Sequence, residues 1–520
     1  MKKTSFTARI LFSIMLFFLL SYLKYEKIIS LEDWLITVFC ISVSFFFGRI
    51  LFLTTHIFLF ILAVVDLHLK RTYQLSVFES APWIFMFILD TNATEIQEYL
   101  PQISITEYVL LACVPLLSVL AWPYRPRWKI SKLWYIVFWL TVPFSYLCHL
   151  YPTAAVFLSS DGKTVLNDHK NFKFNPSVSE KSARNVIVII GESHRYNEFQ
   201  EAFQKYKTDF KDLYGFDDMI SRYPYTMRAV PMILSRKKLK DDTPYFAEKS
   251  LFSLFREAGY ATYFLHYTTS SDLSEKNSLS FIYNEADHFI NFESTKDNLH
   301  DINIRNELNK ILTEDTQKKL IVIKMVGIHI GFQNRYPDEY DIRQPSLKKR
   351  LKEKTSWEKI RSKIFPNRIL SEDKKEEALN TYKNAMDYSV EIIADLFNIA
   401  KKQPEPTLVM FSSDHGICIF EKGHLHIPAN CREAFHIPVL FYLNPALRKN
   451  ISSQKLENMS CNISSPLTQE YLFETIVSLA NLSYPSADAA YNLTDKCLFS
   501  DEKRMVKTFP RDIPAFYEDL

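Results

Sequence analysis

Four short segments of the chain carry side chains that can bind a metal ion or move a proton. Each of the first three follows a short apolar run, and the fourth lies a few residues beyond the third. Carboxylates and imidazoles bind divalent metals, and a set that mixes nitrogen with hard oxygen suits zinc. One Asp-His pair is weak evidence, but four such segments in one domain predict a metal centre. The reactive residues are Glu192, Ser193, His194, Lys324, His329, Asp414, His415, His424 and His426.

Five short apolar runs, rich in Val, Ile, Leu and Phe, predict the strands that position these residues. They lack polar alternation, which is typical of strands buried on both faces of a parallel sheet. Helical patterns at 249–258 and 376–401 separate some of them, so we expect an α/β domain with a mostly parallel central sheet and helices on both faces. Function in such sheets concentrates at the carboxyl ends of the strands. The predicted strands are 185–190, 263–265, 320–323, 407–411 and 439–442.

The first 158 residues have a different character. They contain five apolar runs, each close to the ~20 residues that cross a bilayer. A signal peptide would explain the first run alone, and buried core helices rarely supply five runs so poor in acidic residues. We therefore expect an α-helical membrane domain of five spans at 1–158, a linker at 159–184 and a catalytic domain at 185–520. The runs are 10–23, 34–65 (two spans interrupted at Gly48-Arg49), 108–122 and 134–157.

The charges of the short loops predict the orientation of these spans. Basic residues cluster before the first run and again at 124–132, and basic loops tend to stay in the cytoplasm. Five spans that begin inside end outside, so residues from about 159 onward are expected outside the cytoplasm. A few basic residues would fall on the outer side against this trend, namely Lys24, Lys27, Lys70 and Arg71.

The composition excludes several classes of protein. Lys plus Arg number 62 and Asp plus Glu 59, and the formal charge of +3 argues against a nucleic-acid binder. Hydrophobic residues make up 47% and charged residues 23%, which excludes wholesale disorder. Glycine is scarce, with 9 in 520 residues against about 7% in an average chain, so we expect positional reasons for those retained. Several lie close to the reactive residues: Gly191, Gly327, Gly331, Gly416 and Gly423.

Four cysteines, an even number, lie in the part expected outside the cytoplasm, where disulfides persist. Pairing Cys418 with Cys431 would close the loop that carries the last two histidines. Pairing Cys461 with Cys497 would brace the C-terminal region. The sequence alone allows three pairings, and free thiols are the alternative. Cysteines inside the apolar runs are expected to pack as small apolar residues: Cys40, Cys113 and Cys148.

Five short motifs follow the predicted spans in this order: Val-Ile-Ile-Gly-Glu-Ser (188–193), Thr-Met-Arg-Ala-Val-Pro-Met (226–232), Gly-Ile-His (327–329), Tyr-Lys-Asn-Ala (382–385) and Ser-Asp-His-Gly (413–416). In this order they resemble the phosphoethanolamine transferases of the Gram-negative inner membrane. That family belongs to the alkaline phosphatase/sulfatase superfamily and includes enzymes that modify lipid A. The resemblance covers nearly the whole chain, and it implies a periplasmic hydrolase-like domain after the five spans and the linker.

The resemblance implies a nucleophile and a set of metal ligands. Thr226, five residues before Pro231, matches the threonine that the family uses as nucleophile. Glu192, Asp414 and His415 match its zinc ligands, and Thr226 completes the set. A threonine hydroxyl is a poor nucleophile near pH 7, and zinc coordination would favour its alkoxide.

The resemblance also implies residues that contact the substrates. His329 matches a histidine that binds phosphate in the family. His426, with His424 as the alternative, matches a second one. These histidines can donate hydrogen bonds or a proton at the phosphoryl oxygens. Thr91 and Glu95 match a loop that faces the lipid.

The implied reaction moves phosphoethanolamine from phosphatidylethanolamine to a lipopolysaccharide acceptor, either a core sugar or lipid A, through a phosphothreonine. Zinc is the implied cofactor, and the bilayer is a partner because the donor lipid cannot leave it. We expect a multi-pass monomer of the bacterial inner membrane with its catalytic domain in the periplasm. The alternative within enzymes is a phosphoglycerol transferase or phosphodiesterase of the same superfamily acting on another periplasmic glycan. A non-enzyme alternative is a membrane-anchored sensor or scaffold with a degenerate site.

The chain departs from the family pattern at several positions. Ser193 stands where many members have Thr and is a rival nucleophile. Lys324 stands where some members have His, and Ile330-Gly331 replaces Gly-Pro. Phe87 replaces a polar residue of the lipid-facing loop, which weakens the assignment of lipid A as acceptor more than that of the reaction. Two further histidines are expected to be structural, His194 and His436.

Overall fold

The computed structural model describes residues 172–241, 248–268, 280–293, 301–314, 317–353, 374–421, 425–426, 430–499, 502–509 and 512–520, all within one compact unit of the chain. The five expected spans lie outside these residues, as do Thr91, Glu95 and His424. In the part of the chain that is described, no helix is both long and apolar enough to cross a membrane.

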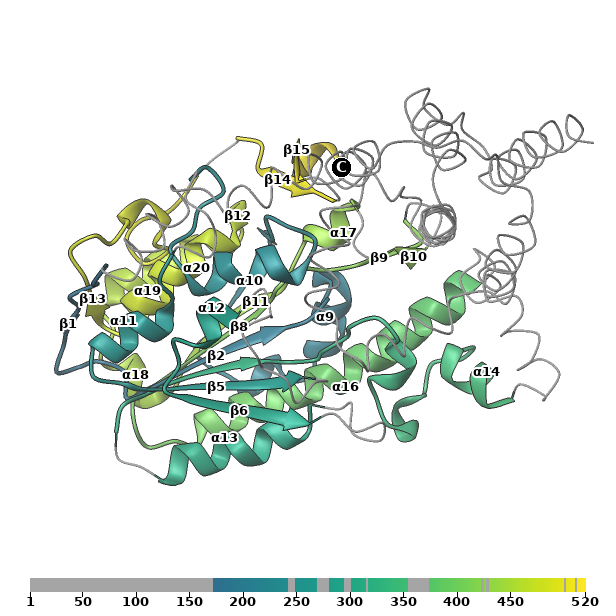
Figure 1. Ribbon diagram of the computed structural model, residues 1–520, viewed down its shortest axis with the longest axis horizontal. Coiled ribbons are helices and arrows are strands. Elements are labelled where there is room, and N and C mark those ends of the chain that lie inside the picture. The colour runs from purple at the N-terminus through teal and green to yellow at the C-terminus, as the bar shows by residue number, and fades with distance from the viewer. Residues whose placement is uncertain are drawn as a thin grey trace, which may run out of the picture. The chain divides into compact units, whose positions relative to one another are not determined.

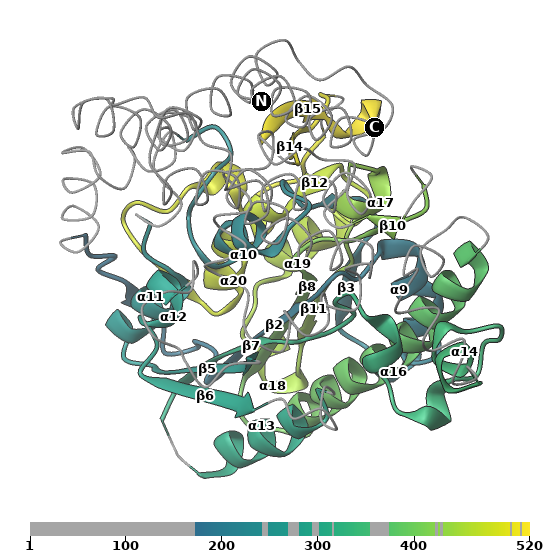
Figure 2. The same cartoon turned by 45° about the vertical axis from the view of Figure 1, so that its right-hand side comes forward.

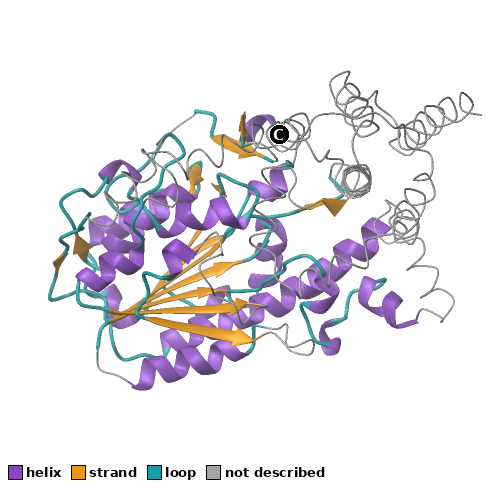
Figure 3. Cartoon of the chain, in the orientation of Figure 1, coloured by secondary structure: helices purple, strands orange, loops and turns teal. Residues whose placement is uncertain are grey.

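A central sheet of seven strands organises the described residues (Figure 1; strands orange in Figure 3). β2 lies at its centre, parallel to β7 on one side and to β8 on the other, and all seven residues of β2 are buried. The five strands predicted from the apolar runs are confirmed. In spatial order the strands are β3 (Leu213–Phe216), β11 (Val439–Leu443), β8 (Thr407–Ser413), β2 (Asn185–Gly191), β7 (Lys319–Lys324), β5 (Ala261–Thr268) and β6 (His288–Glu293).

The sheet is mixed, because β11 runs antiparallel to both of its neighbours. The sequence prediction, which treated this run as one more parallel strand, is wrong in that respect. A run of buried apolar residues carries no information about strand direction. Between β8 and β11 the described chain forms only short elements, β9 (Cys418–Ile419), β10 (Leu425–His426) and α17 (Arg432–Phe435), and no long crossover helix of the kind that joins parallel neighbours.

The prediction also missed the two edge strands, β3 and β6. Each has one neighbouring strand, and most of their described side chains are only partly buried. Their sequences therefore lack the continuous apolar run that marks the central strands.

Helices cover both faces of the sheet, as predicted (Figures 1 and 2). β2 shows how alternate side chains supply the two cores: Ile187 and Ile189 pack with Phe199 on one face, and Val186 and Val188 pack with Leu254 on the other. Each such buried side chain stabilises the fold by roughly 1.5–3 kcal/mol. On the first face lie α9 (Tyr196–Phe203), α13 (Asn303–Glu314) and α16 (Lys375–Lys401); on the second lie α10 (Thr226–Leu234), α11 (Leu251–Glu257), α19 (Ser453–Cys461) and α20 (Leu472–Leu479).

Short elements complete the described structure. The small pairs are β1 (Ser177–Val178) with β13 (Leu482–Ser483), β4 (Met219–Ile220) with β12 (Leu467–Thr468), β9 with β10, and β14 (Met505–Thr508) with β15 (Ile513–Phe516). The remaining α-helices are α12 (Ser280–Tyr283), α14 (Leu347–Glu353) and α18 (Pro445–Arg448).

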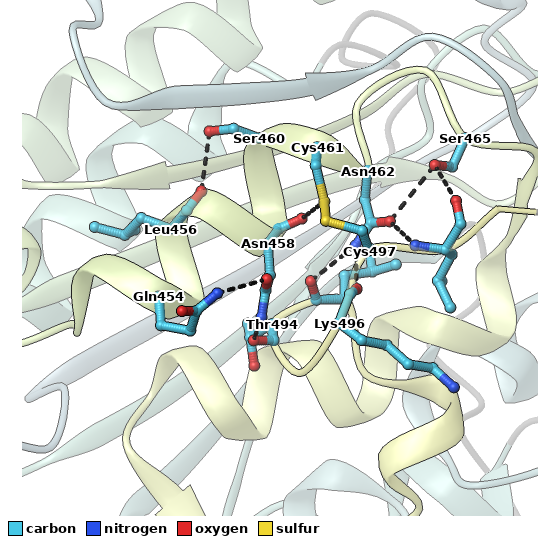
Figure 4. The surroundings of a disulfide bond; sticks show 12 residues. Gln454, Leu456, Asn458, Ser460, Cys461, Asn462, Ser465, Thr494, Lys496 and Cys497 are labelled. Carbon is cyan, nitrogen blue, oxygen red and sulfur yellow. Dashed lines mark hydrogen bonds between the residues drawn. A yellow bond between two sulfur atoms is a disulfide. The ribbon is translucent and has the colours of Figure 1, made fainter.

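Two disulfides, Cys418–Cys431 and Cys461–Cys497, confirm that the four cysteines pair with their neighbours in the sequence. The second disulfide joins the end of α19 to the segment 493–498 (Figure 4). Asn462 reinforces this junction, because its side-chain nitrogen donates to the carbonyls of Leu493 (3.0 Å) and Lys496 (2.8 Å). The C-terminal segment is thereby held against the helical layer.

Candidate active site

The carboxyl ends of two adjacent strands bring three of the predicted metal ligands together. Glu192 follows β2, and Asp414 and His415 follow β8; Ile190 pairs with Ser412, so the two strands end level with each other. One ligand atom from each of the three side chains lies within 4.8 Å of the others, and all three residues are buried. The sequence predicted the two strands from their apolar runs but not their register. The register places two carboxylates and one imidazole side by side.

Thr226 joins this group from the start of α10. Its Oγ1 donates a hydrogen bond to Glu192 Oε2 (3.0 Å) and lies 3.3 Å from His415 Nε2. Thr226 is the first residue of a helix whose first turn carries no acidic side chain. A helix N-terminus presents free N–H groups and favours negative charge. The hydroxyl therefore stands where an anionic group would be stabilised.

Ser193, the rival nucleophile, has a different environment. Its backbone adopts φ +62°, and its N–H donates to Asp414 Oδ1 (3.2 Å) while its Oγ donates to Glu192 Oε1 (2.8 Å). Ser193 is 2% exposed, whereas Thr226 is only partly buried. The geometry favours Thr226 as the residue that a substrate can reach, and gives Ser193 the role of holding the two carboxylates in place.

His415 presents one ring nitrogen to the group. Its Nδ1 donates to the Gly416 carbonyl (2.6 Å), and its Nε2 faces Glu192 Oε1 at 3.3 Å, where it donates when the ring is protonated and can bind a metal when it is neutral. This orientation by a backbone carbonyl is the usual arrangement of a metal-binding histidine. Burial lowers the pKa of His415, but the neighbouring carboxylates of Asp414 and Glu192 outweigh it and raise the pKa to about 9.

The donor set fits a zinc ion. Asp414 Oδ2 is fully buried and accepts no hydrogen bond of good geometry, although the Lys324 ammonium lies 3.2 Å away, so this oxygen still has a free coordination position for a metal ion. Burial and the nearby Glu192 carboxylate raise the pKa of Asp414, so a dication would relieve their repulsion. Two carboxylates, one imidazole and the Thr226 hydroxyl supply nitrogen and hard oxygen, which suits zinc.

One further described grouping of potential ligands does not fit a metal. It combines Glu421 with Cys418 and Cys431. The two cysteines are joined in a disulfide, so neither offers a thiolate.

Lys324, the last residue of β7, also reaches this group. Its Nζ lies 2.7 Å from Glu192 Oε2 and 3.2 Å from Asp414 Oδ2, and its side chain is buried. Burial alone would lower the pKa of Lys324, but the charges of Asp414 and Glu192 raise it. The sequence placed this lysine among the reactive side chains that follow the strands, at a position where some family members have His, but assigned it no role.

The loop that carries His329 packs against the backbone of Glu192. Gly327 has φ +52°, and a Cβ at this position would lie 2.8 Å from both the N and the O of Glu192. The N–H of Ile328 donates to the Glu192 carbonyl (2.9 Å). Burial is the main cause that lowers the pKa of His329 to about 4, so its imidazole is neutral near pH 7 and suited to donating a hydrogen bond.

Asp301, which precedes α13, holds the same loop from its other side. Its two carboxylate oxygens accept the backbone N–H groups of Val326 and Gly327 (2.9 Å each). Burial raises the pKa of Asp301 to about 6, against the lowering effect of these two bonds. Sequence reasoning missed this residue, because no motif or apolar run marks an aspartate whose partners lie 25 and 26 residues further along the chain.

The remaining predicted residues are placed as follows. His426 lies in β10 opposite Cys418 of β9, and its side chain is outside the description. His194 is fully buried, with its Nε2 2.8 Å from Ser389 Oγ, and His436 Nε2 lies 2.9 Å from the Asp217 carbonyl. Both of these contacts agree with the structural role expected for the two histidines.

The family model described as Sulfatase matches residues 184–482 of this chain. That stretch is more than half of the 520 residues and contains the strand ends just described. The chain belongs to the sulfatase family.

Among curated proteins, the chain is similar to phosphoethanolamine transferase EptC of Escherichia coli, with 23% identity over 337 residues that cover 61% of this chain and 54% of the relative. It is also similar to the Kdo(2)-lipid A phosphoethanolamine 7''-transferase of Salmonella typhimurium, with 23% identity over 371 residues that cover 66% and 59%. The chain thus spans somewhat more than half the length of these relatives.

Two solved structures share the fold. The periplasmic domain of Escherichia coli EptC in complex with Zn has a TM-score of 0.54 at 20% identity and covers 67% of this chain and 96% of that one. The integral membrane lipooligosaccharide phosphoethanolamine transferase A of Neisseria meningitidis has a TM-score of 0.60 at 14% identity and covers 85% and 86%. The resemblance to phosphoethanolamine transferases that the motifs indicated is confirmed.

Proposed function

We propose that this protein transfers phosphoethanolamine from phosphatidylethanolamine to a lipopolysaccharide acceptor, a core sugar or lipid A, through a phosphothreonine at Thr226. One observation carries the proposal. The hydroxyl of Thr226, at the N-terminus of α10, donates to Glu192 beside the buried Asp414 and His415. The names of the curated relatives support the class of reaction, since they are phosphoethanolamine transferases.

In the first step, Thr226 Oγ1 attacks the phosphorus of phosphatidylethanolamine and the bond from phosphorus to the diacylglycerol oxygen breaks. Glu192 Oε2, which accepts the hydroxyl hydrogen bond, orients the attacking oxygen. The proton that Thr226 loses balances the proton that the diacylglycerol hydroxyl gains. A zinc ion held by Glu192, Asp414, His415 and Thr226 would lower the pKa of the hydroxyl and neutralise charge on the phosphoryl oxygens.

In the second step, a hydroxyl or phosphate oxygen of the acceptor attacks the phosphorus, and Thr226 Oγ1 leaves and regains a proton. The neutral imidazole of His329 donates a hydrogen bond to a phosphoryl oxygen as charge develops there. We assign a second contact of the same kind to His426, with His424 as the alternative.

The proposed setting is the bacterial inner membrane, with the catalytic domain in the periplasm and the protein acting as a monomer. The donor lipid stays in the bilayer, so the five spans expected in residues 1–158 would keep the catalytic domain near it, and Thr91 and Glu95 would contact the lipid. The two disulfides support an oxidising compartment.

Mass spectrometry of lipopolysaccharide from cells with and without the gene tests the proposal. We expect a mass increase that corresponds to phosphoethanolamine and its complete loss with Thr226→Ala. Ser193→Ala, which removes one hydrogen bond to Glu192 but not the nucleophile, should give a reduced but measurable increase. Addition of phosphoglycerol in place of phosphoethanolamine would show instead that the protein is a phosphoglycerol transferase, the alternative within the same superfamily. Lipopolysaccharide that is the same with and without the gene would contradict the proposed acceptor.

A further inference from the structure

A buried ammonium lies inside the proposed metal centre. Lys324 Nζ contacts both carboxylates of the ligand set, at 2.7 Å from Glu192 Oε2 and 3.2 Å from Asp414 Oδ2. Lys324 is the residue paired with Ile190 at the end of β7, so the sheet register itself brings the ammonium to this place. The side chain is 5% exposed, which leaves bulk water little access to its charge.

The charges of the centre limit how many metal ions it can hold. The two carboxylates contribute two negative charges and the ammonium one positive charge. One dication then brings the sum to one positive charge, whereas a second dication would bring it to three in a buried region. Like charges a few Å apart repel strongly where the effective dielectric constant is low, and unpaired buried charge is costly.

The ammonium also stands next to the attacking oxygen. Glu192 Oε2 accepts hydrogen bonds from both Lys324 Nζ (2.7 Å) and Thr226 Oγ1 (3.0 Å). A positive charge therefore lies beside the threonine that would carry the phosphoryl group. A second bound ion would supply the same kind of charge at this place.

We propose that Lys324 is the fixed second cation of the centre, so that Glu192 and Asp414 hold one metal ion and exclude another. This inference rests on the proposed function, since it concerns the same metal site. Lys324 acts here through the carboxylates and the metal count, and so it is a positioning residue.

The test counts and titrates zinc in the full chain purified in detergent. Zinc per chain is measured by elemental mass spectrometry after equilibrium dialysis, and zinc affinity by competition with a chelator, for the wild type, Lys324→Met and Lys324→His. Lys318→Met is the matched control, because this lysine donates to Ser182 Oγ (2.7 Å) just before the other end of β7.

We expect one zinc per wild-type chain and per Lys318→Met chain. Lys324→Met should bind its zinc about tenfold more tightly or better, because the repelling charge is gone and the two carboxylates have lost their partner. Lys324→His, which adds a ligand where the charge was, should bind a second zinc. Should the methionine variant not fold, as judged by thermal melting, Lys324→Gln repeats the test with the charge removed and a hydrogen-bond donor kept.

Two tightly bound zinc ions in the wild type would overturn the inference, and so would an unchanged zinc affinity and count in the charge-removing variants. A wild type that binds no zinc would remove both the inference and the proposed zinc site. One zinc per chain with the expected tightening, but without phosphoethanolamine transfer, would leave the inference standing and sink the proposed function alone.

Discussion

Zinc affinity should depend steeply on pH, because His415, the proposed imidazole ligand, carries a proton in the metal-free protein. The carboxylates of Asp414 and Glu192 raise its pKa to about 9 despite burial. Metal binding needs the neutral imidazole, so zinc has to displace this proton. In the metal-free fold, the protonated imidazole contributes stability that is complete below the unfolded pKa of 6.5 and is lost as the pH rises through about 9.

The magnitude follows from the two pKa values. The difference between 6.5 and about 9 corresponds to roughly 3 kcal/mol of stability of the metal-free protein at low pH. At pH values below the His415 pKa of about 9, each unit by which the pH is lowered weakens the apparent zinc affinity about tenfold. Between about pH 8 and about pH 6.5, proton competition at this one residue should therefore weaken binding about thirtyfold.

Chelator competition at a series of pH values, corrected for protonation of the chelator, measures this slope. His415→Gln should bind zinc more weakly and lose most of the slope. His436→Gln is the control, since this histidine contacts the Asp217 carbonyl and lies outside the ligand set. A wild-type zinc affinity that changes less than about twofold over this range would refute the reasoning that His415 is a protonated ligand.

Three further predictions concern the nucleophile, the loop and the disulfide. Incubation with labelled phosphatidylethanolamine should leave label on the wild type and none on Thr226→Ala; label retained by that variant would contradict the nucleophile. Asp301→Ala leaves the buried Gly327 N–H and the partly buried Val326 N–H without acceptors, which should cost about 1–3 kcal/mol in denaturant unfolding and at least about tenfold in transfer rate through the displaced loop; the control Asp287→Ala, which removes an acceptor of Thr262, should lose stability but not transfer, and equal rate losses would contradict a specific role. Replacing both Cys461 and Cys497 by Ser should lower stability by about 4 kcal/mol, from the 36-residue separation of the crosslinked ends, which a melting curve unaffected by the change would disprove.

Much of the central sheet could be predicted because its signal is local. The runs around Ile187, Ile321 and Val409 are apolar on both sides of the strand, and only a strand buried on both faces needs that pattern. The residues directly after these runs could then be assigned to one edge of the sheet, which is how Glu192 and Asp414 entered the candidate site. The direction of β11 and the edge strands β3 and β6 could not be predicted, because pairing and direction depend on distant segments.

Other parts of the candidate site depend on contacts between distant residues. Gly327 illustrates this. The composition showed that glycines are few, but not why this position needs one. A Cβ at Gly327 would lie 2.8 Å from the backbone of Glu192, 135 residues earlier in the chain. Asp301 carries no motif, and its function in holding the loop follows from two hydrogen bonds that only the folded chain forms.

The sequence by itself determined which reactive side chains follow the central strands, since residue type and apolar periodicity are properties of a short stretch of chain. Only the tertiary structure decided how those side chains meet. It buried Ser193 and left Thr226 accessible, and it set the Lys324 ammonium between the two carboxylates. Distances of a few Å between residues more than a hundred positions apart arise from strand register and helix packing, and these are decided by the whole fold at once.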